Sequence, residues 1–381
     1  MNEGRPGVSS HPFGTDAIER LDILDRRSFF LASLATAMPT MARSRASLAP
    51  GQLLITGFRG TKLGDGDVDR VRGMLEAGLC AGVIFLRRNC IFPEQISLLS
   101  RAFRDAAGDL TPIISIDQEG GRVARLDGGN GFLNWMSARE ISSSGMSDAE
   151  VKAYWTKRAW QLSEAGINLN YAPVVDLDVN PDNPVIGKLG RAFGNEPGQV
   201  SRMAELFIRA HRDAGVKTVL KHFPGHGSSS TDSHKDTADI SKSWKENEYE
   251  PFANMMRGGL VDGVMNGHLV HPRFSDESWM PASLSWNSVK EIRQTLGFQG
   301  AIITDDMHMA AVEDLMPLEA AAVAAVNAGN TFLIYSNYRK SDKIDTVERV
   351  TAALVRNLDR MSPAEVTDQI SLAREFRLRL R

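Results

Sequence analysis

The 381-residue chain has little of several features that would identify a function quickly. It contains only two cysteines, Cys80 and Cys90, too few for a disulfide scaffold or for paired CxxC zinc ligands. A single bridge between them stays open, because a sequence does not give the separation of two thiols in space. Lys and Arg number 44 and Asp and Glu 47, so the net charge of −3 offers no field that attracts nucleic acid.

Several motifs of known chemistry are also missing. There is no GxxxxGK[ST] phosphate loop and no HExxH zinc helix. The GxSxG turn that carries a nucleophilic serine is absent as well. The apolar run at residues 29–38 is too short for a comfortable membrane span. We therefore expect neither a nucleic-acid partner nor stable membrane insertion.

The N-terminal segment carries a pattern typical of export signals. Two consecutive arginines, Arg26 and Arg27, directly precede the apolar run 29–38, and small residues follow it. This order of charged, apolar and small residues is that of a signal peptide, and the arginine pair resembles the twin-arginine type. The alternative is an ordinary helix, which would leave the protein in the cytoplasm. We expect residues 1–46 to be an N-terminal extension that directs the protein to the periplasm or outside the cell.

From residue 50 onward, short apolar segments alternate with helical patterns. Each apolar segment is rich in Val, Ile and Leu, as parallel strands covered on both faces are. The predicted strands are residues 52–58, 82–86, 112–117, 168–175, 218–222, 263–268, 301–304 and 331–335. The predicted helices are residues 67–77, 93–107, 148–165, 197–214, 244–257, 285–296, 317–328, 341–358 and 363–380.

Eight β-α units predict an α/β fold, a TIM-type (β/α)8 barrel, with a single catalytic domain over residues 50–381. The alternative is an open doubly wound sheet. It is weaker because no glycine-rich dinucleotide turn opens the first β-α unit.

Polar residues follow four of the predicted strands, where a TIM barrel has its active site. Asp117 ends the third strand, and Lys221 and His222 end the fifth. His268 ends the sixth strand and Asp305 follows the seventh. Such side chains suit a polyhydroxylated substrate, and glycoside hydrolysis needs a carboxylate at the anomeric carbon together with a proton donor. Asp305 is the candidate for the carboxylate, but the residues alone do not indicate the donor.

Asp306 directly follows Asp305 and complicates this assignment. Successive residues of a strand face opposite sides. We therefore expect only one of the two carboxylates to face the pocket. A structural carboxylate that caps a loop is the alternative for either.

The chain resembles glycoside hydrolase family 3, in particular its single-domain β-N-acetylglucosaminidase branch. The most specific stretch is KHFPGHG at residues 221–227, followed at a fixed gap by Asp-Ser-His at 232–234. The segments 117–126 and 190–194 are also similar to the family, and so is Thr-Asp-Asp-Met at 304–307. Two residues depart from the pattern: Ser228 replaces a usual Asp and Met307 a usual Leu.

The resemblance implies a retaining exo-β-N-acetylhexosaminidase that acts on oligosaccharides containing N-acetylglucosamine, derived from peptidoglycan or chitin. Asp305 would attack the anomeric carbon, and His234, oriented by Asp232, would exchange the proton. Histidine titrates near neutral pH, and a carboxylate on its second nitrogen fixes its tautomer. The resemblance implies sugar-binding roles for Asp117, Arg125, Arg191, Lys221 and His222. No metal or organic cofactor is required.

Three other functions stay open. A phosphorylase is one, because a histidine does not repel a phosphate acceptor as a carboxylate would. A β-glucosidase is another, although that branch commonly carries a second domain and a carboxylate acid/base. A non-catalytic carbohydrate-binding barrel is the third. We expect His226 to shape its loop rather than to touch substrate, and His268, His271 and His308 to be structural. The sequence indicates no oligomeric state.

Overall fold

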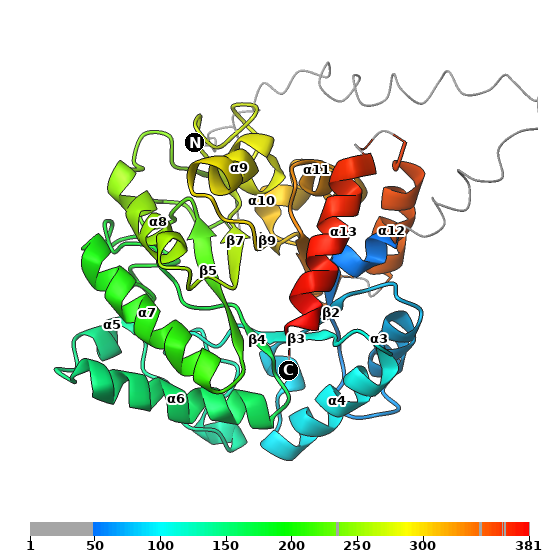
Figure 1. Ribbon diagram of the computed structural model, residues 1–381, viewed down its shortest axis with the longest axis horizontal. Helices are drawn as coiled ribbons and strands as arrows, with labels where there is room; N and C mark the ends of the chain where they lie inside the picture. The colour runs from blue at the N-terminus through cyan, green and yellow to red at the C-terminus, as the bar shows by residue number, and fades with distance from the viewer. Residues whose placement is uncertain (1–48, 234–235, 343–344, 360, 362, 381) are drawn as a thin grey trace, which may run out of the picture. The chain divides into compact units, whose positions relative to one another are not determined.

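The computed structural model describes residues 49–381, except 234–235, 343–344, 360, 362 and 381. The predicted extension, residues 1–46, lies outside the described residues. The chain from residue 49 onward forms a closed barrel in the strand order β1-β10-β9-β7-β5-β4-β3-β2, so the prediction of a (β/α)8 barrel is confirmed (Figure 1). The barrel strands are all parallel: β1 Leu54–Gly57, β2 Gly82–Phe85, β3 Ile113–Ile116, β4 Leu169–Asn170, β5 Lys217–Phe223, β7 Gly263–Asn266, β9 Ala301–Asp306 and β10 Phe332–Tyr335.

Strand β4 is much shorter than the apolar run 168–175 predicts. Pro173 interrupts the run and has no N–H to donate to a neighbouring strand. Pairing resumes one residue later, in an isolated bridge between Val174 and Lys221. A second small sheet was not predicted, and it pairs β6 (Ala238–Asp239) with β8 (Leu269–Val270).

Helices surround the barrel strands (Figure 1). The α-helices are α3 Gly66–Glu76, α4 Pro93–Ala106, α5 Ala138–Ser142, α6 Asp148–Glu164, α7 Pro197–Asp213, α8 Glu250–Arg257, α9 Trp286–Lys290, α10 Ala310–Glu313, α11 Leu318–Asn327, α12 Thr346–Arg356 and α13 Pro363–Leu378. Short 3-10 turns are η1 Pro50–Leu53, η2 Arg87–Asn89, η3 Gly128–Asn130, η4 Glu246–Tyr249 and η5 Ala282–Leu284, and η6 Glu291–Thr295 is a π-turn.

The helix predicted over 244–257 is divided into η4 and α8. Pro251 lies in the first turn of α8, the one place where a missing N–H removes no helical hydrogen bond. The helix predicted over 285–296 likewise begins as α9 and ends in the π-turn η6.

The core lies between the strands and the surrounding helices. Phe58 is fully buried, and its ring centroid lies 5.2 Å from those of both Phe85 on β2 and Phe103 on α4. Trp155 on α6 contacts Phe207 on α7 in the same edge-to-face manner at 5.2 Å. Cys80 and Cys90 are buried with free thiols, so the bridge that the sequence left open does not form.

The C-terminal helix α13 packs against segments at the end of the barrel at which the strands begin. Arg377 donates to the carbonyl oxygens of Leu110 and Thr111, just before β3, at 2.8 and 2.9 Å. The helix also packs against η1, which precedes β1. The loops that carry the polar residues lie at the opposite end of the barrel, where the strands finish.

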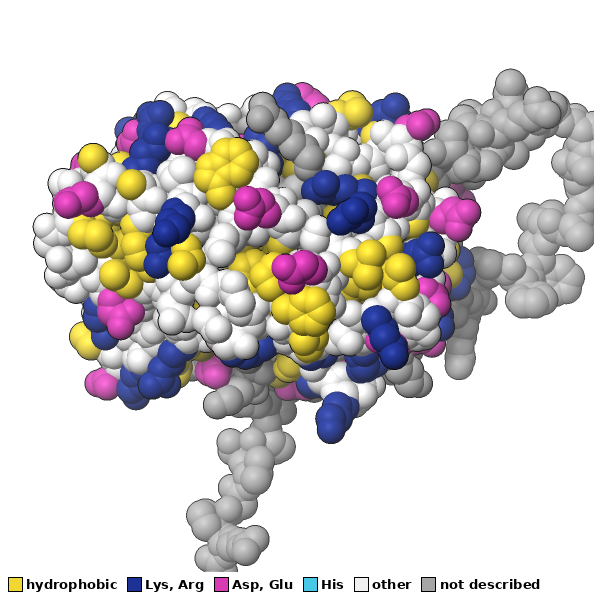
Figure 2. Space-filling model, turned by 90° about the horizontal axis from the view of Figure 1, so that it is seen from below, with side chains coloured by type: hydrophobic (Ala, Val, Ile, Leu, Met, Phe, Trp, Pro, Cys, Tyr) yellow, Lys and Arg dark blue, Asp and Glu magenta, His cyan; other side chains and the backbone are white. Residues whose placement is uncertain are grey.

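The surface is mixed in charge. On the face shown in Figure 2, Lys and Arg side chains are interspersed with Asp and Glu, and neither sign forms a continuous patch. Among the helices that the structure describes, none is both long enough and apolar enough to cross a membrane.

Candidate active site

A cavity of about 720 Å³ opens at the C-terminal ends of the barrel strands. Seven of the eight residues that the sequence analysis selected line it: Asp117, Arg125, Arg191, Lys221, His222, Asp232 and Asp305. The eighth, His234, lies outside the described residues. Residues as far apart in sequence as Asp117 and Asp305 meet here because parallel strands all finish at the same end of the barrel.

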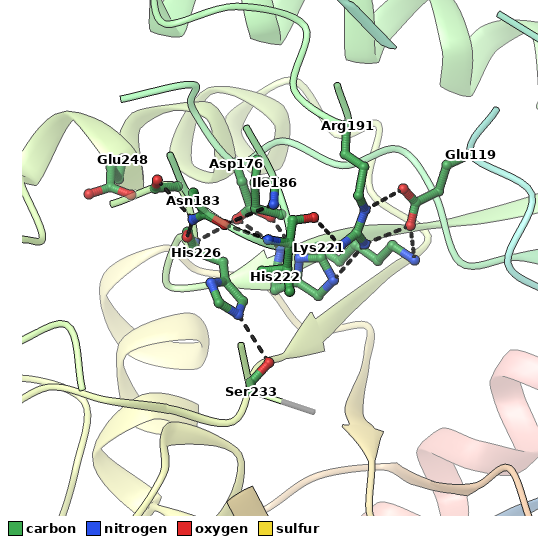
Figure 3. Close-up of polar contacts among 12 residues, drawn as sticks. Glu119, Asp176, Asn183, Ile186, Arg191, Lys221, His222, His226, Ser233 and Glu248 are labelled. Carbon is green, nitrogen blue, oxygen red and sulfur yellow. Dashed lines mark hydrogen bonds and ion pairs between the residues drawn. The ribbon is translucent and has the colours of Figure 1, made fainter. Parts of the chain in front are cut away.

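One side of the cavity is an array of ion pairs, which we call the charged wall: Asp117, Glu119, Arg191, Lys221 and His222. Lys221 is 2% exposed, and its Nζ lies 2.8 Å from Asp117 Oδ1 and 2.6 Å from Glu119 Oε1. Arg191 donates to both oxygens of Glu119, each at 2.8 Å (Figure 3). Two-point pairing of this kind fixes direction as well as distance, so the wall is rigid before any ligand arrives.

The charges of the wall stabilise one another. Burial alone would raise the pKa of Asp117, but Lys221 and Arg125 outweigh it and hold that pKa below its ordinary value. Burial is likewise outweighed at Glu119, whose pKa Arg191 and Lys221 lower strongly. The same carboxylates raise the pKa of Lys221 against the effect of burial. At neutral pH the wall therefore presents fixed charges to the cavity.

Asp176 lies behind the wall and fixes His222. Asp176 is fully buried, and its Oδ2 lies 2.6 Å from His222 Nδ1. The other ring nitrogen, Nε2, lies 3.3 Å from Nη2 of Arg191, which can only donate. In this arrangement Nδ1 carries the proton and Nε2 accepts, so both nitrogens of His222 are engaged. His222 can orient Arg191 but is poorly placed to exchange protons with a substrate.

Asp305 and Asp306 both line the cavity, so the expectation that only one would face it is wrong. The pairing of β9 with β10 is irregular here, because Phe332 pairs with Ile303 but Ile334 pairs with Asp306. The extra residue on β9 interrupts the alternation of a regular strand.

The two carboxylates nevertheless differ in their partners. Asp306 Oδ1 accepts from the backbone N–H groups of Ser336 and His308 at 3.0 and 3.2 Å, and Oδ2 bonds the Ser336 hydroxyl. Asp305 Oδ1 accepts from the N–H of Asp306 at 2.8 Å. Asp306 thus joins β9 to the end of β10, which gives it a structural task.

Asp232 reaches the cavity from the loop that follows β5, residues 225–233. Gly227 permits the close passage of this loop, since a Cβ there would lie 1.9 Å from the Leu177 carbonyl oxygen. Asn183 donates to the carbonyls of His226 and Gly227 at 2.7 and 3.0 Å. Glu248 accepts from the N–H of Ser228 at 3.0 Å. These contacts hold the start of the loop against Asn183 and Glu248 (Figure 3).

Sequence reasoning missed two residues of the site. Glu119 lies in the segment 117–126, which is similar to the family, but it was given no role, and neither was Asp176. Both had a signal: Lys221 and Arg191 are two cations that Asp117 alone does not neutralise, which indicates a second carboxylate. Asp176 directly follows the fourth apolar run, at the same end of the barrel as the other polar residues.

The histidines left without a role are accounted for in part. His268 is buried, with Nδ1 2.7 Å from Ser283 Oγ and Nε2 3.0 Å from the Asp306 carbonyl oxygen, as a structural histidine would be. His308, Glu313 and Asp342 each place one potential metal-ligand atom within 4.8 Å of the others. Arg339 bonds both of these carboxylates, to Asp342 at 2.9 Å. A metal ion would have to displace this guanidinium, so we interpret the cluster as an ion-pair network.

The closed parallel barrel, with carboxylates and cations around a cavity at the strand ends, defines a TIM-barrel enzyme. The sequence model described as "Glycosyl hydrolase family 3 N terminal domain" matches residues 51–370. The chain therefore belongs to glycosyl hydrolase family 3 and is a glycoside hydrolase by family.

Relatives of known name are similar over most of their length. A β-hexosaminidase of Tolumonas auensis is 34% identical over 272 residues, which are 70% of this chain and 79% of that protein. A β-hexosaminidase of Stenotrophomonas maltophilia is 32% identical over 286 residues, 73% of this chain and 81% of that one.

Solved structures agree with this placement. The family 3 β-N-acetylglucosaminidase from Paenibacillus sp. superposes with a TM-score of 0.79 at 30% identity over 87% of this chain. The chain spans 62% of the length of that protein. The β-N-acetylhexosaminidase from Beutenbergia cavernae matches with a TM-score of 0.76 at 27% identity, over 86% of this chain and 96% of that one.

Proposed function

We propose that the protein is an exo-acting β-N-acetylhexosaminidase that releases terminal β-linked N-acetylglucosamine. The observation that carries the proposal is the cavity itself, at which Asp305, Asp232 and the charged wall converge. The names of the relatives, β-hexosaminidase and β-N-acetylglucosaminidase, supply the sugar. Oligosaccharides derived from peptidoglycan or chitin are the substrates that contain it.

The charged wall is suited to a ring of sugar hydroxyls. A hydroxyl both donates and accepts, so a carboxylate such as Asp117 binds its hydrogen while a cation such as Lys221 or Arg191 binds its oxygen. Because these groups are already paired with one another, they lose little freedom when a sugar enters. Sugar binding is thus the part that we assign to Asp117, Arg125, Arg191, Lys221 and His222.

The reaction follows the retaining course. Asp305 attacks the anomeric carbon, the bond to the leaving oxygen breaks, and a covalent glycosyl-enzyme forms. His234, oriented by Asp232, gives its proton to the leaving oxygen. It then takes a proton from the water that attacks the anomeric carbon and frees Asp305. Two displacements at one carbon restore the β configuration.

Hydrolysis is tested with the 4-nitrophenyl β-glycosides of N-acetylglucosamine and of glucose. We expect turnover of the first to exceed that of the second at least tenfold in kcat/KM. Proton NMR at early times should show the β-anomer of the released sugar. Initial release of the α-anomer would contradict the covalent intermediate. Sugar binding without any turnover would contradict an enzymatic role.

Phosphate distinguishes hydrolysis from phosphorolysis. A hydrolase releases free N-acetylglucosamine at a rate that does not rise with phosphate concentration. If N-acetylglucosamine 1-phosphate forms and the rate rises with phosphate, the acceptor is phosphate and the proposal of hydrolysis is wrong.

We also propose that residues 1–46 direct export, on the strength of Arg26, Arg27 and the apolar run that follows. The test is to fuse residues 1–46 to a reporter protein that needs no disulfide. Export should be lost when both arginines are replaced by lysine. A reporter that stays in the cytoplasm with the native segment would contradict the proposal.

A further inference from the structure

A hydrogen bond inside the 225–233 loop has no part in the chemistry described above. His226 Nε2 lies 3.1 Å from Ser233 Oγ, and both residues are buried, each 3% exposed. In the sequence, Ser233 directly follows Asp232, which lines the cavity, and directly precedes His234. A contact at Ser233 therefore restricts the positions that the adjoining peptide groups can take.

The surroundings of His226 determine the direction of this bond. Its Nδ1 is buried and has no hydrogen-bond partner among the described residues. Because a buried N–H without an acceptor is rarer than a buried acceptor without a donor, the proton belongs on Nε2, which donates to Ser233 Oγ. Burial also lowers the pKa of His226 to about 4, which keeps the ring neutral at neutral pH.

His226 is itself tied to the charged wall. Its backbone N–H donates to Asp176 Oδ1 at 2.8 Å, and the same oxygen accepts from the N–H of His222 at 3.1 Å. Asn183 holds the His226 carbonyl at 2.7 Å. One buried carboxylate thus fixes both His222, at the wall, and His226, at the start of the loop (Figure 3).

We propose that His226 and Ser233 are positioning residues for proton transfer. Their hydrogen bond links Ser233, at the end of the loop, to His226, whose backbone is held by Asp176 behind the charged wall. The bond thereby fixes the position of Asp232 at the cavity. The inference rests on the proposed function, because it matters only if Asp232 and His234 exchange the proton. Without the bond, sugar binding and Asp305 stay in place while proton transfer loses its geometry.

The experiment compares two substrates that differ in how much they need a proton donor. N,N′-diacetylchitobiose has a sugar alkoxide as leaving group, whereas the 4-nitrophenyl β-N-acetylglucosaminide has a leaving group that departs almost unaided. For Ser233→Ala and for His226→Leu we expect kcat on diacetylchitobiose to fall about tenfold, the equivalent of one misplaced hydrogen bond. On the nitrophenyl substrate we expect a loss of less than about threefold. KM should change little on either substrate.

Matched variants separate positioning from general damage to the loop. Ser229→Ala removes a hydroxyl that bonds Thr231 in the same loop, at 2.8 and 3.1 Å, without touching His226 through its side chain. It should not change the ratio of the two kcat values. His226→Gln keeps a donor near the Nε2 position and should restore most of that ratio. The double variant should be no worse than either single one, because both remove the same bond.

Equal losses on both substrates, or an unchanged ratio in Ser233→Ala, would overturn the inference. Thermal melts monitor folding, and if His226→Leu fails to fold, Ser233→Ala against Ser229→Ala decides alone. Failure of the proposed function looks different, because the wild-type protein would then turn over neither substrate.

Discussion

The charged wall and the 225–233 loop lie at the same cavity, but different interactions hold them in place. In the wall, the buried cations Lys221 and Arg191 pair with the carboxylates of Asp117 and Glu119 at 2.6–2.8 Å. In the loop, Asp232 is half-buried, and among the described residues the side chain of the neighbouring Ser233 has one neutral hydrogen bond, with His226. Ion pairs with two-point geometry resist displacement far more than one neutral hydrogen bond does.

The difference matches the two tasks that we assign. A sugar is bound best by groups that are already in place, since ordering them on binding would weaken affinity. Proton transfer needs a group that can act at two stages of the reaction and let the product leave. On this assignment the wall governs stability and binding, whereas the loop governs proton transfer.

The largest effect is expected at Asp305, which belongs to neither region and to which we assign the attack on the anomeric carbon. Asp305→Asn should lower kcat/KM on the nitrophenyl substrate by at least about a thousandfold, because an amide is no nucleophile. Asp306→Asn is the matched control, one residue away and also at the cavity. It should mainly lower thermal stability, since Asp306 bonds Ser336 and His308. A reversed order of the two losses would place the nucleophile at Asp306.

Glu119 should give the next largest effect, and it tests the wall. Glu119→Gln leaves Arg191 and Lys221 buried without their shared anion, which should cost about 3–5 kcal/mol of unfolding free energy and raise KM. Glu205→Gln is the control, because Glu205 pairs with Arg209 at 2.8 Å on an exposed face. That change should cost less than about 1 kcal/mol. Denaturant titration measures both, and equal values would show that the wall is not held by its ion pairs.

Asp232→Asn tests the loop. We expect kcat on diacetylchitobiose to fall about a hundredfold, the lower end for loss of acid–base catalysis, with a smaller fall on the nitrophenyl substrate. Melting temperature should stay near that of the wild type, because Asp232 is only half-buried. Asp182→Asn, at an exposed aspartate of which 93% is accessible, is the control and should change neither rate. A large loss of stability in Asp232→Asn would make its role structural.

Replacing Glu248 should give the smallest effect on turnover. It tests the contact between the Glu248 carboxyl group and the backbone of the 225–233 loop. Burial raises the pKa of Glu248 to about 7. A raised pKa in the folded state means that its stabilising contribution is complete below pH 4.5 and is lost as pH rises through about 7. The wild type should therefore lose on the order of 2 kcal/mol between pH 5 and pH 8 relative to Glu248→Gln.

The comparison of pH slopes needs its own control. Glu250→Gln changes a neighbouring but exposed glutamate and should keep the wild-type slope. Urea titrations at pH 5 and pH 8 measure the difference. If Glu248→Gln retains the full slope, the carboxyl of Glu248 does not titrate in this range.

Much of the barrel was predictable because its strands are buried on both faces. Such strands must be apolar throughout, and all eight apolar runs proved to overlap a barrel strand. Strand β4 was overestimated, since hydrophobicity alone does not register the N–H that Pro173 lacks. The short elements α5 and α10 were missed, because helices of five and four residues carry too little periodicity to detect.

The candidate site, too, was predictable only in part. Asp117, Lys221 and Asp305 were recognisable because a charged residue at the end of an apolar strand has few structural reasons to be there. Glu119 was missed as a partner because its ion pair with Arg191 joins residues 72 positions apart. The presence of both Asp305 and Asp306 at the cavity was not predicted, because the irregular pairing of β9 with β10 depends on the partner strand.

The sequence by itself determined the alternation of strands and helices, the end of the barrel at which the polar residues gather, and, through its resemblance to a family, the chemistry to expect of them. These follow from local composition and order along the chain. Only the tertiary structure decided which charges pair, which histidine nitrogen carries a proton, and how His226 reaches Ser233. Hydrogen bonds and ion pairs act over about 3 Å, and a distance of that size between residues far apart in sequence exists only once the barrel has closed.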